Sequence, residues 1–124
     1  MNNTPRETET ADAARAMLPL KPEVFHILLA LVEEARHGYA IMREVAARTA
    51  GEVQILPGAL YRHLDRLRSS GVIEEIGEGE GEDSRRRSYR VTNFGRRVAE
   101  AEASRLARLV VAAAGRNLVK GWAK

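Results

Sequence analysis

The sequence has no cysteine, few aromatic side chains and no long apolar run. The absence of cysteine excludes disulfide bonds, thiol catalysis and zinc sites built on Cys, and it fits a reducing cytosol. No apolar stretch approaches the roughly 20 residues that span a bilayer. The N-terminus also lacks the basic start and apolar block of a secretory signal. We therefore expect a cytoplasmic protein that is not a membrane protein.

The composition predicts one soluble, helix-rich domain. The 124 residues are 30% charged and 44% hydrophobic, with a net charge of +3. That charge is unevenly distributed: residues 57–90 carry seven basic and seven acidic groups, whereas residues 91–124 carry seven and two. Any positive patch within residues 57–90 must therefore come from segregation of charges and not from an excess of one sign.

Four segments have the apolar spacing of amphipathic helices. They begin at Pro22, after a break near His37, at Pro57, and at a cap provided by Thr92 or Asn93. The buried positions expected in the first three are Val24, Ile27, Leu28, Leu31, Val32, Ile41, Met42, Val45, Ala46, Leu60, Leu64 and Leu67. Residues 1–20 are either disordered or contain an extra helix over residues 10–18.

Between the third and fourth helices, two short β-prone pieces flank a Gly/Glu loop. Val72, Ile73 and Ile76 lie in one piece, and Tyr89 and Val91 in the other, as in a hairpin. Another β-prone piece, at 53–56, precedes the third helix. Three helices and a hairpin predict a mainly α fold, the winged helix-turn-helix, over residues 21–92. An N-terminal extension (1–20) precedes this domain, and a C-terminal dimerisation helix and tail (93–124) follow it.

The helix that begins at Pro57 has a narrow leucine stripe on one face and arginines and small or polar residues on the opposite face. Gly58, Ala59, Arg62, Asp65, Arg66 and Ser69 point away from the leucines. An α-helix fits the major groove of B-DNA, arginine suits guanine edges and phosphates, and the free N–H groups after Pro57 can bind a phosphate. The alternative is a surface helix with solvated arginines.

Arg85, Arg86 and Arg87 are consecutive cations at the base of the second hairpin strand. Because neighbouring side chains alternate between faces, at most two can address one surface. They either contact phosphates or form a charged edge that resists aggregation. The acidic loop beside them either bends away from DNA or pairs with arginines; its acids are Glu78, Glu80, Glu82 and Asp83.

Three motifs together resemble the PadR family of bacterial transcriptional regulators. They are HGY from His37, PGALYRHLDRL from Pro57 and RRRSYRVT from Arg85, within a similarity over residues 20–98. The resemblance implies a homodimer on a palindromic operator, usually a repressor, with a C-terminal dimerisation helix. Small aromatic or drug-like effectors are known in the family. Thr or Ser is common where this chain has Ala59, so a hydroxyl contact is lost there.

The resemblance also implies that Tyr39 and Tyr61 lie near the DNA backbone, although each could instead fill the junction between the second and third helices. His63 is expected to be an exposed helix residue that could touch a phosphate. The predicted DNA-binding residues are Tyr39, Pro57, Gly58, Ala59, Tyr61, Arg62, His63, Arg66, Arg85, Arg86, Arg87 and Tyr89.

The last helix has more apolar surface than a small domain can cover, which predicts an interface. The predicted dimerisation residues are Phe94, Val98, Ala101, Leu106, Leu109, Val110 and Ala113. Binding to a membrane surface is the rival explanation of this basic helix, but its apolar side is rich in alanine. Trp122 packs on the partner, lines an effector cavity, or is loose.

No histidine pair stands four residues apart on a helix, and no Cys or clustered carboxylates join the histidines, so we expect no metal site. The sequence has no evident nucleophile with a base partner and no phosphate-binding glycine loop, so we expect neither an enzyme nor a cofactor. The expected function is sequence-specific binding of double-stranded DNA by a homodimeric repressor. The alternative is a winged-helix module that binds protein without specific DNA binding.

Overall fold

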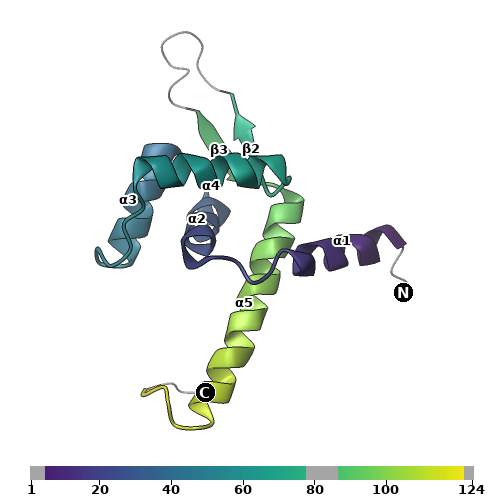
Figure 1. The fold of residues 1–124 in the computed structure, drawn as a ribbon, viewed down its shortest axis with the longest axis vertical. Helices are drawn as coiled ribbons and strands as arrows, with labels where there is room; N and C mark the ends of the chain where they lie inside the picture. Colours follow the sequence, from purple (N-terminus) through teal and green to yellow (C-terminus); the bar gives the residue numbers. More distant parts are fainter. Residues whose placement is uncertain (1–4, 78–86, 122–124) are drawn as a thin grey trace.

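The computed structural model of the protein describes residues 5–77 and 87–121. Within these residues it contains five helices and a three-stranded antiparallel sheet (Figure 1). The elements are α1 (Pro5–Ala16), α2 (Pro22–Glu33), β1 (Arg36–His37), α3 (Gly38–Arg48), α4 (Pro57–Ser69), β2 (Ile73–Ile76), β3 (Ser88–Val91) and α5 (Asn93–Ala114). The order of α2, α3, α4 and a hairpin confirms the predicted winged helix-turn-helix.

The helices begin where the sequence predicts. Pro22 and Pro57 occupy the first positions of α2 and α4, where the missing N–H has no helical partner to lose. His37 caps α3, because its Nδ1 accepts a hydrogen bond from the backbone N of Ala40 at 3.4 Å. Thr92 caps α5 in the same way, accepting from the backbone N of Gly95 at 2.9 Å.

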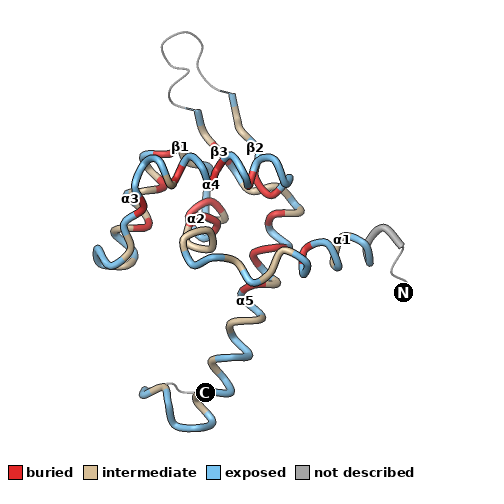
Figure 2. The backbone as a smooth tube through the Cα atoms, in the orientation of Figure 1, coloured by how far each residue is buried: buried red, intermediate tan, exposed pale blue. Residues whose placement is uncertain are grey.

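The core lies between α2, α3, α4, the sheet and the first half of α5. Buried residues line the inward sides of these elements, whereas the second half of α5 has none (Figure 2). Ile27, Leu28, Leu31, Ile41, Val45, Leu60, Leu64 and Leu67 are buried as predicted, together with Ile55, Val72 and Ile73. The other four predicted positions are only half-buried: Val24, Val32, Met42 and Ala46. This core fixes how α4 and the hairpin stand relative to each other.

The strand predicted before α4 does not form, and the sheet has a different third strand. The β-prone piece at 53–56 is not a strand; the third strand is β1, which pairs with β3 so that the sheet order is β1-β3-β2. The backbone N of Val53 instead bonds the Thr49 hydroxyl at 3.0 Å, and Ile55 turns into the core. The β-branched side chains of this piece therefore serve burial and not strand pairing.

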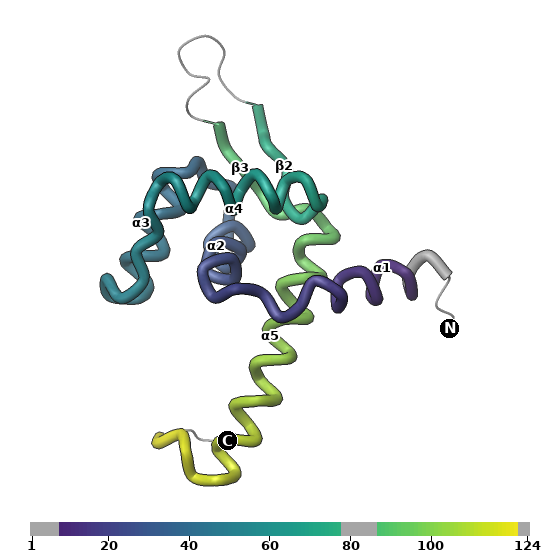
Figure 3. The backbone as a smooth tube through the Cα atoms, viewed as in Figure 1, coloured from purple at the N-terminus to yellow at the C-terminus, as the bar shows by residue number. Residues whose placement is uncertain are grey.

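Of the two alternatives for the N-terminal extension, the structure has the extra helix, which runs over Pro5–Ala16 and not over the predicted residues 10–18. α1 packs against α5, and its Ala14 is buried (Figure 1). The segment between α1 and α2 passes beside α5, where the backbone N of Leu20 donates to the buried carboxylate of Glu102 at 3.2 Å (Figure 3). Nε of Arg105 donates to the same carboxylate at 2.7 Å and lowers the pKa of Glu102.

The start of α5 is pressed against the hairpin. A Cβ on Gly95 would overlap the carbonyl oxygen of Val72, so only glycine fits at this contact. The backbone N of Thr92 donates to the same oxygen at 3.0 Å, and the Thr92 hydroxyl donates to the carbonyl of Gly71 at 2.6 Å. These contacts tie the base of the hairpin to the first turn of α5.

Candidate nucleic-acid interface

The first turn of α4 is open to solvent. Leu56 forms the N-cap without a side-chain hydrogen bond, so its side chain does not satisfy the first N–H groups. Gly58 is exposed, and a Cβ built on it would meet no atom within 4 Å. Ala59 is half-buried against the core. Pro57 and Gly58 therefore leave the helix start accessible to an anionic group, as the sequence predicts for a phosphate.

The inner face of α4 contains one residue that was predicted wrongly. His63 is buried and not exposed, and its Nε2 lies 2.9 Å from Oε1 of Glu23 in α2. Its position on the helix is next to that of Leu67, so the imidazole joins the leucine stripe. A phosphate contact by His63 does not fit this burial; the residue holds α4 against α2.

The outer face of α4 carries two free guanidinium groups. Arg62 and Arg66 are exposed, and neither forms an ion pair or a side-chain hydrogen bond with any other described residue. Arg68 differs, because its NH2 atom lies 2.7 Å from Oδ1 of Asp65, and this bond raises the pKa of Arg68. Arg62 and Arg66 are therefore the cations of α4 that are available to a ligand.

Two tyrosines stand at the junction of α3 and α4. Tyr39 is 60% exposed and Tyr61 is 47% exposed. A Cβ on Gly38 would lie only 2.8 Å from Cζ of Tyr61, which explains why glycine precedes Tyr39. The guanidinium of Arg43 lies 5.6 Å from the centre of the Tyr39 ring, a cation–π distance. The junction thus combines two exposed phenols with a cation. This exposure is compatible with both roles considered for the tyrosines, contact with the DNA backbone and filling of the junction between the helices.

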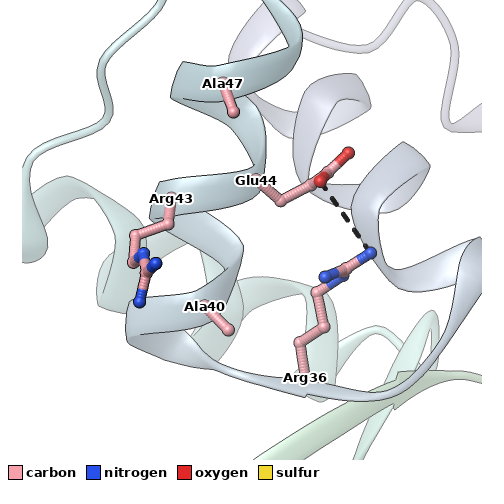
Figure 4. A pocket seen from close by; sticks show the side chains of 5 residues that line it. All are labelled: Arg36, Ala40, Arg43, Glu44 and Ala47. Atoms are coloured by element: carbon pink, nitrogen blue, oxygen red, sulfur yellow. Dashed lines mark ion pairs between the residues drawn. The ribbon is translucent and has the colours of Figure 1, made fainter.

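A cleft of about 310 Å³ lies on α3 beside this junction (Figure 4). Its lining residues are Arg36, Ala40, Arg43, Glu44 and Ala47. Arg36 reaches Glu44 at 4.0 Å and Glu33 at 2.7 Å, while Arg43 points to the other side of the helix (Figure 4). The Arg36 charge is therefore neutralised within the chain, and Arg43 is the free cation of this surface among the five lining residues.

The hairpin of β2 and β3, called the wing below, carries arginines that are paired with glutamates. Nε of Arg87 lies 3.0 Å from Glu75, and Nε of Arg90 lies 2.6 Å from Glu74. Tyr89 is buried, contrary to the contact role predicted for it, and burial raises the pKa of its phenol. Arg85, Arg86 and the acidic residues of the loop lie outside the described residues.

Between α4 and the wing lies a second cleft, of about 340 Å³. Its lining residues are Tyr61, Arg62, Leu64, Asp65, Arg68, Glu75, Arg87 and Tyr89. Charged side chains from both elements meet there, since Glu75 is within 4.0 Å of Arg68 as well as close to Arg87. Four of these residues were among the predicted DNA-binding residues, but their grouping with Asp65, Arg68 and Glu75 was not predicted, because the members come from three separate elements.

The predicted dimerisation residues divide into two groups. Val98 has no exposed surface and Phe94 is half-buried against the core, so these two pack within the chain and the interface role predicted for Val98 does not fit. Beyond Glu102, no residue of α5 is buried. Leu109 is 56% exposed, and Ala101, Leu106, Val110 and Ala113 are half-buried. Trp122 lies outside the described residues.

The family of the chain follows from comparison with known proteins. Its sequence matches the model of the Transcriptional regulator PadR-like family over residues 27–101, more than half of the chain and all of the elements from α3 to the wing. The chain belongs to the PadR-like family. PadR-like proteins are transcriptional regulators and not enzymes.

Individual proteins are also similar to this PadR-like chain. An uncharacterized protein X from Lysinibacillus sphaericus is 34% identical over 70 residues, which are 56% of this chain and 64% of that protein. The chain thus spans less than two thirds of this relative. A transcriptional regulator from Clostridium thermocellum has 28% identity and a TM-score of 0.59, with 81% of this chain and 94% of that chain covered.

The structure of Bacillus subtilis PadR in complex with operator DNA is similar in fold. It has 19% identity and a TM-score of 0.58, and the similarity covers 71% of this chain and 48% of that chain.

Among the described residues, no group of three or more His, Asp or Glu side chains could hold a metal ion. No helix within residues 5–77 and 87–121 is long and apolar enough to cross a bilayer.

Proposed function

We propose that this PadR-like chain is a sequence-specific DNA-binding repressor that acts as a homodimer on a palindromic operator. The observation that carries the proposal is the division of α4 into two faces. Its leucine stripe is buried, whereas Arg62 and Arg66 point to solvent without a partner among the described residues. A helix anchored on one side with free guanidinium groups on the other suits insertion into a major groove.

Further contacts to the DNA backbone follow from the surroundings of α4. The open first turn at Pro57 and Gly58 offers backbone N–H groups to a phosphate. Tyr39 and Tyr61 offer exposed phenols beside it, and Arg43 adds a positive charge. In this proposal the arginines of α4 read base edges or phosphates, and the tyrosines fix the register on the backbone.

The dimer would form through the second half of α5. Leu106, Leu109, Val110 and Ala113 follow one another at helical spacing, and this part of α5 is not buried by the described residues of its own chain. A second copy would cover this apolar surface. Two α4 helices in a two-fold dimer would then read half-sites about 34 Å apart, one turn of B-DNA.

The test is fluorescence anisotropy with duplex DNA from the chain's own promoter, against a random duplex of equal length, over a salt series. Log affinity should fall linearly with log salt, with a slope of about −0.9 for each phosphate contacted. Arg62→Ala with Arg66→Ala should abolish the preference for the promoter duplex. Equal affinity for both duplexes at every salt concentration would rule out a sequence-specific regulator.

A matched control removes the same charge from the far end of the molecule. Arg116 and Lys120 are exposed and follow the end of α5, remote from α4 (Figure 1). Arg116→Ala with Lys120→Ala changes the net charge by the same amount as the α4 double substitution. It should leave the promoter preference intact. Loss of preference in both double variants would attribute the effect to net charge and not to α4.

The second candidate function is a winged-helix module that binds a protein. It is favoured by the pairing of Arg68, Arg87 and Arg90 with acidic side chains, which leaves the described part of the wing with little net positive charge. Under this alternative, the α4 double substitution would leave DNA binding unchanged. The same anisotropy experiment therefore distinguishes the two functions.

Relief of repression by a small aromatic or drug-like effector is also part of the proposal, since such effectors are known in PadR-like regulators. Titration of such compounds into the complex of protein and promoter duplex would lower the anisotropy if an effector releases the DNA. The fluorescence of Trp122, the only tryptophan, provides an independent readout of binding near the C-terminus.

A further inference from the structure

The cleft between α4 and the wing contains a chain of alternating charges. Asp65 pairs with Arg68 at 2.7 Å, Arg68 approaches Glu75 at 4.0 Å, and Glu75 pairs with Arg87 at 3.0 Å. Glu75 thus faces guanidinium groups from two elements, α4 and the segment that leads into β3. Its position follows from the strand register, in which Glu75 stands opposite Tyr89, on the side of the sheet that faces α4.

The exposure of these groups is unequal. The side chains of Arg68 and Arg87 are 49% and 57% exposed, whereas that of Glu75 is 24% exposed. The two cations therefore lie at the mouth of the cleft, and the carboxylate lies deeper, behind them. An anion that approaches from solvent reaches the cations before it meets Glu75.

We propose that Glu75 competes with DNA phosphate for Arg68 and Arg87: by holding these two cations it keeps them from phosphates and thereby lowers the affinity for any duplex. This inference rests on the proposed DNA-binding function and adds a residue that sets its strength. A phosphodiester carries one negative charge and oxygen acceptors, as a carboxylate does, so the two compete for the same guanidinium groups.

The neighbouring residue provides a matched control on the same strand. Glu74 pairs with Arg90 at 2.6 Å and stands opposite it in the register. Because side chains alternate along a strand, Glu74 and Arg90 lie on the other face of the sheet from Glu75 and the α4 cleft. Glu74→Gln and Glu75→Gln therefore remove the same charge from adjacent positions, but only the second change frees cations beside α4.

The experiment measures the salt dependence of binding for the full chain and its variants, with promoter and random duplexes. Glu75→Gln should raise the affinity for both duplexes by the same factor and steepen the log–log slope by about 0.9 for each arginine released. If one additional phosphate contact contributes nothing to the affinity at 1 M salt, a slope of about 0.9 makes it raise the affinity by about 8-fold at 0.1 M. Glu74→Gln should leave slope and affinity as in the wild type.

A second background separates competition from simple repulsion between Glu75 and phosphate. In a chain that already carries Arg68→Ala and Arg87→Ala, the competition model predicts that Glu75→Gln has little further effect. If Glu75→Gln raises the affinity equally in both backgrounds, repulsion explains the gain and the inference is wrong. An unchanged slope for Glu75→Gln in the wild-type background would overturn it as well.

These outcomes are distinct from failure of the proposed function. If the wild type binds the promoter with preference and a steep salt slope, and Glu75→Gln does not alter that slope, DNA binding stands and the role of Glu75 falls. If the wild type binds neither duplex, and Glu75→Gln binds neither, both proposals fall.

Discussion

Gly95→Ala should destabilise the protein, although the same change in most helices is stabilising. Gly95 is the third residue of α5, where alanine would ordinarily gain about 0.5–1 kcal/mol over glycine. Here the new Cβ would overlap the carbonyl oxygen of Val72 and lie 2.6 Å from Cγ2 of Val91. Since the carbonyl belongs to the backbone, it cannot rotate away as a long side chain could.

The expected magnitude combines three effects. Insertion of a methyl group into a packed contact costs about 1–3 kcal/mol. Displacement of the Val72 carbonyl also weakens the hydrogen bond from the backbone N of Thr92, now 3.0 Å long, which contributes about 1 kcal/mol. After subtraction of the gain in helix propensity, we expect a net loss of about 2 kcal/mol in the free energy of unfolding.

The assay is urea unfolding followed by far-UV circular dichroism, at one fixed protein concentration because assembly would change the apparent stability. Gly58→Ala is the matched control, since Gly58 is also in a helix but is exposed with no atom near the added Cβ. The control should match or slightly exceed the wild type. A Gly95→Ala midpoint equal to that of the wild type, with an unchanged m-value, would refute the contact between α5 and the wing.

Four further changes test other contacts. Gly38→Ala should leave stability nearly unchanged, because the exposed Tyr61 side chain can move aside, but should weaken promoter binding in anisotropy by displacing its hydroxyl. Glu23→Ala should cost about 1–3 kcal/mol in urea unfolding, because the buried Nε2 of His63 loses its partner. Glu102→Gln should destabilise at pH 7, since the pKa of this carboxyl is lowered by Arg105; the wild type keeps that contribution above about pH 4.5 and loses it as the pH falls through the lowered pKa, so the two unfolding midpoints should converge in acid. If the proposed homodimer forms, Leu109→Asp should shift it toward monomer in sedimentation velocity while the far-UV circular dichroism of the folded chain stays that of the wild type, because Leu109 is exposed within its own chain.

Features that depend on neighbouring residues were predictable from the sequence. Pro22 and Pro57 fix helix starts through their own backbone geometry, and the stripe of Leu60, Leu64 and Leu67 follows from the period of a helix. The outward direction of Arg62 and Arg66 follows from the same period, since both positions lie on the side of the helix opposite the leucines.

Features that depend on distant partners were not predictable. His63 lies beside the stripe on the helix, but its burial requires a carboxylate 40 residues away, and no local pattern connects it to Glu23. β1 has only two residues, too few for an alternation pattern, and it exists because β3 offers free backbone groups. The pairing of Glu75 with Arg87 likewise crosses the hairpin.

The glycine between His37 and Tyr39 is a local signal of a close contact. Glycine between a capping histidine and an exposed tyrosine is a costly residue for a helix start, which indicates that another group approaches closely there. That group is Tyr61 of α4, so glycine at position 38 lets α3 and α4 approach closely at the junction that carries both tyrosines.

The unbroken course of α5 has a mechanical consequence. Its 22 residues make a rod of about 33 Å, whose first half packs on the core and the wing and whose second half has no buried residue. A rotation of the rod by about 6° about its C-terminal end would displace its N-terminal end by roughly 3.5 Å, comparable to the rise of one base pair along a duplex. In a dimer joined through the second half of α5, the angle at that joint would therefore set where α4 and the wing meet the DNA.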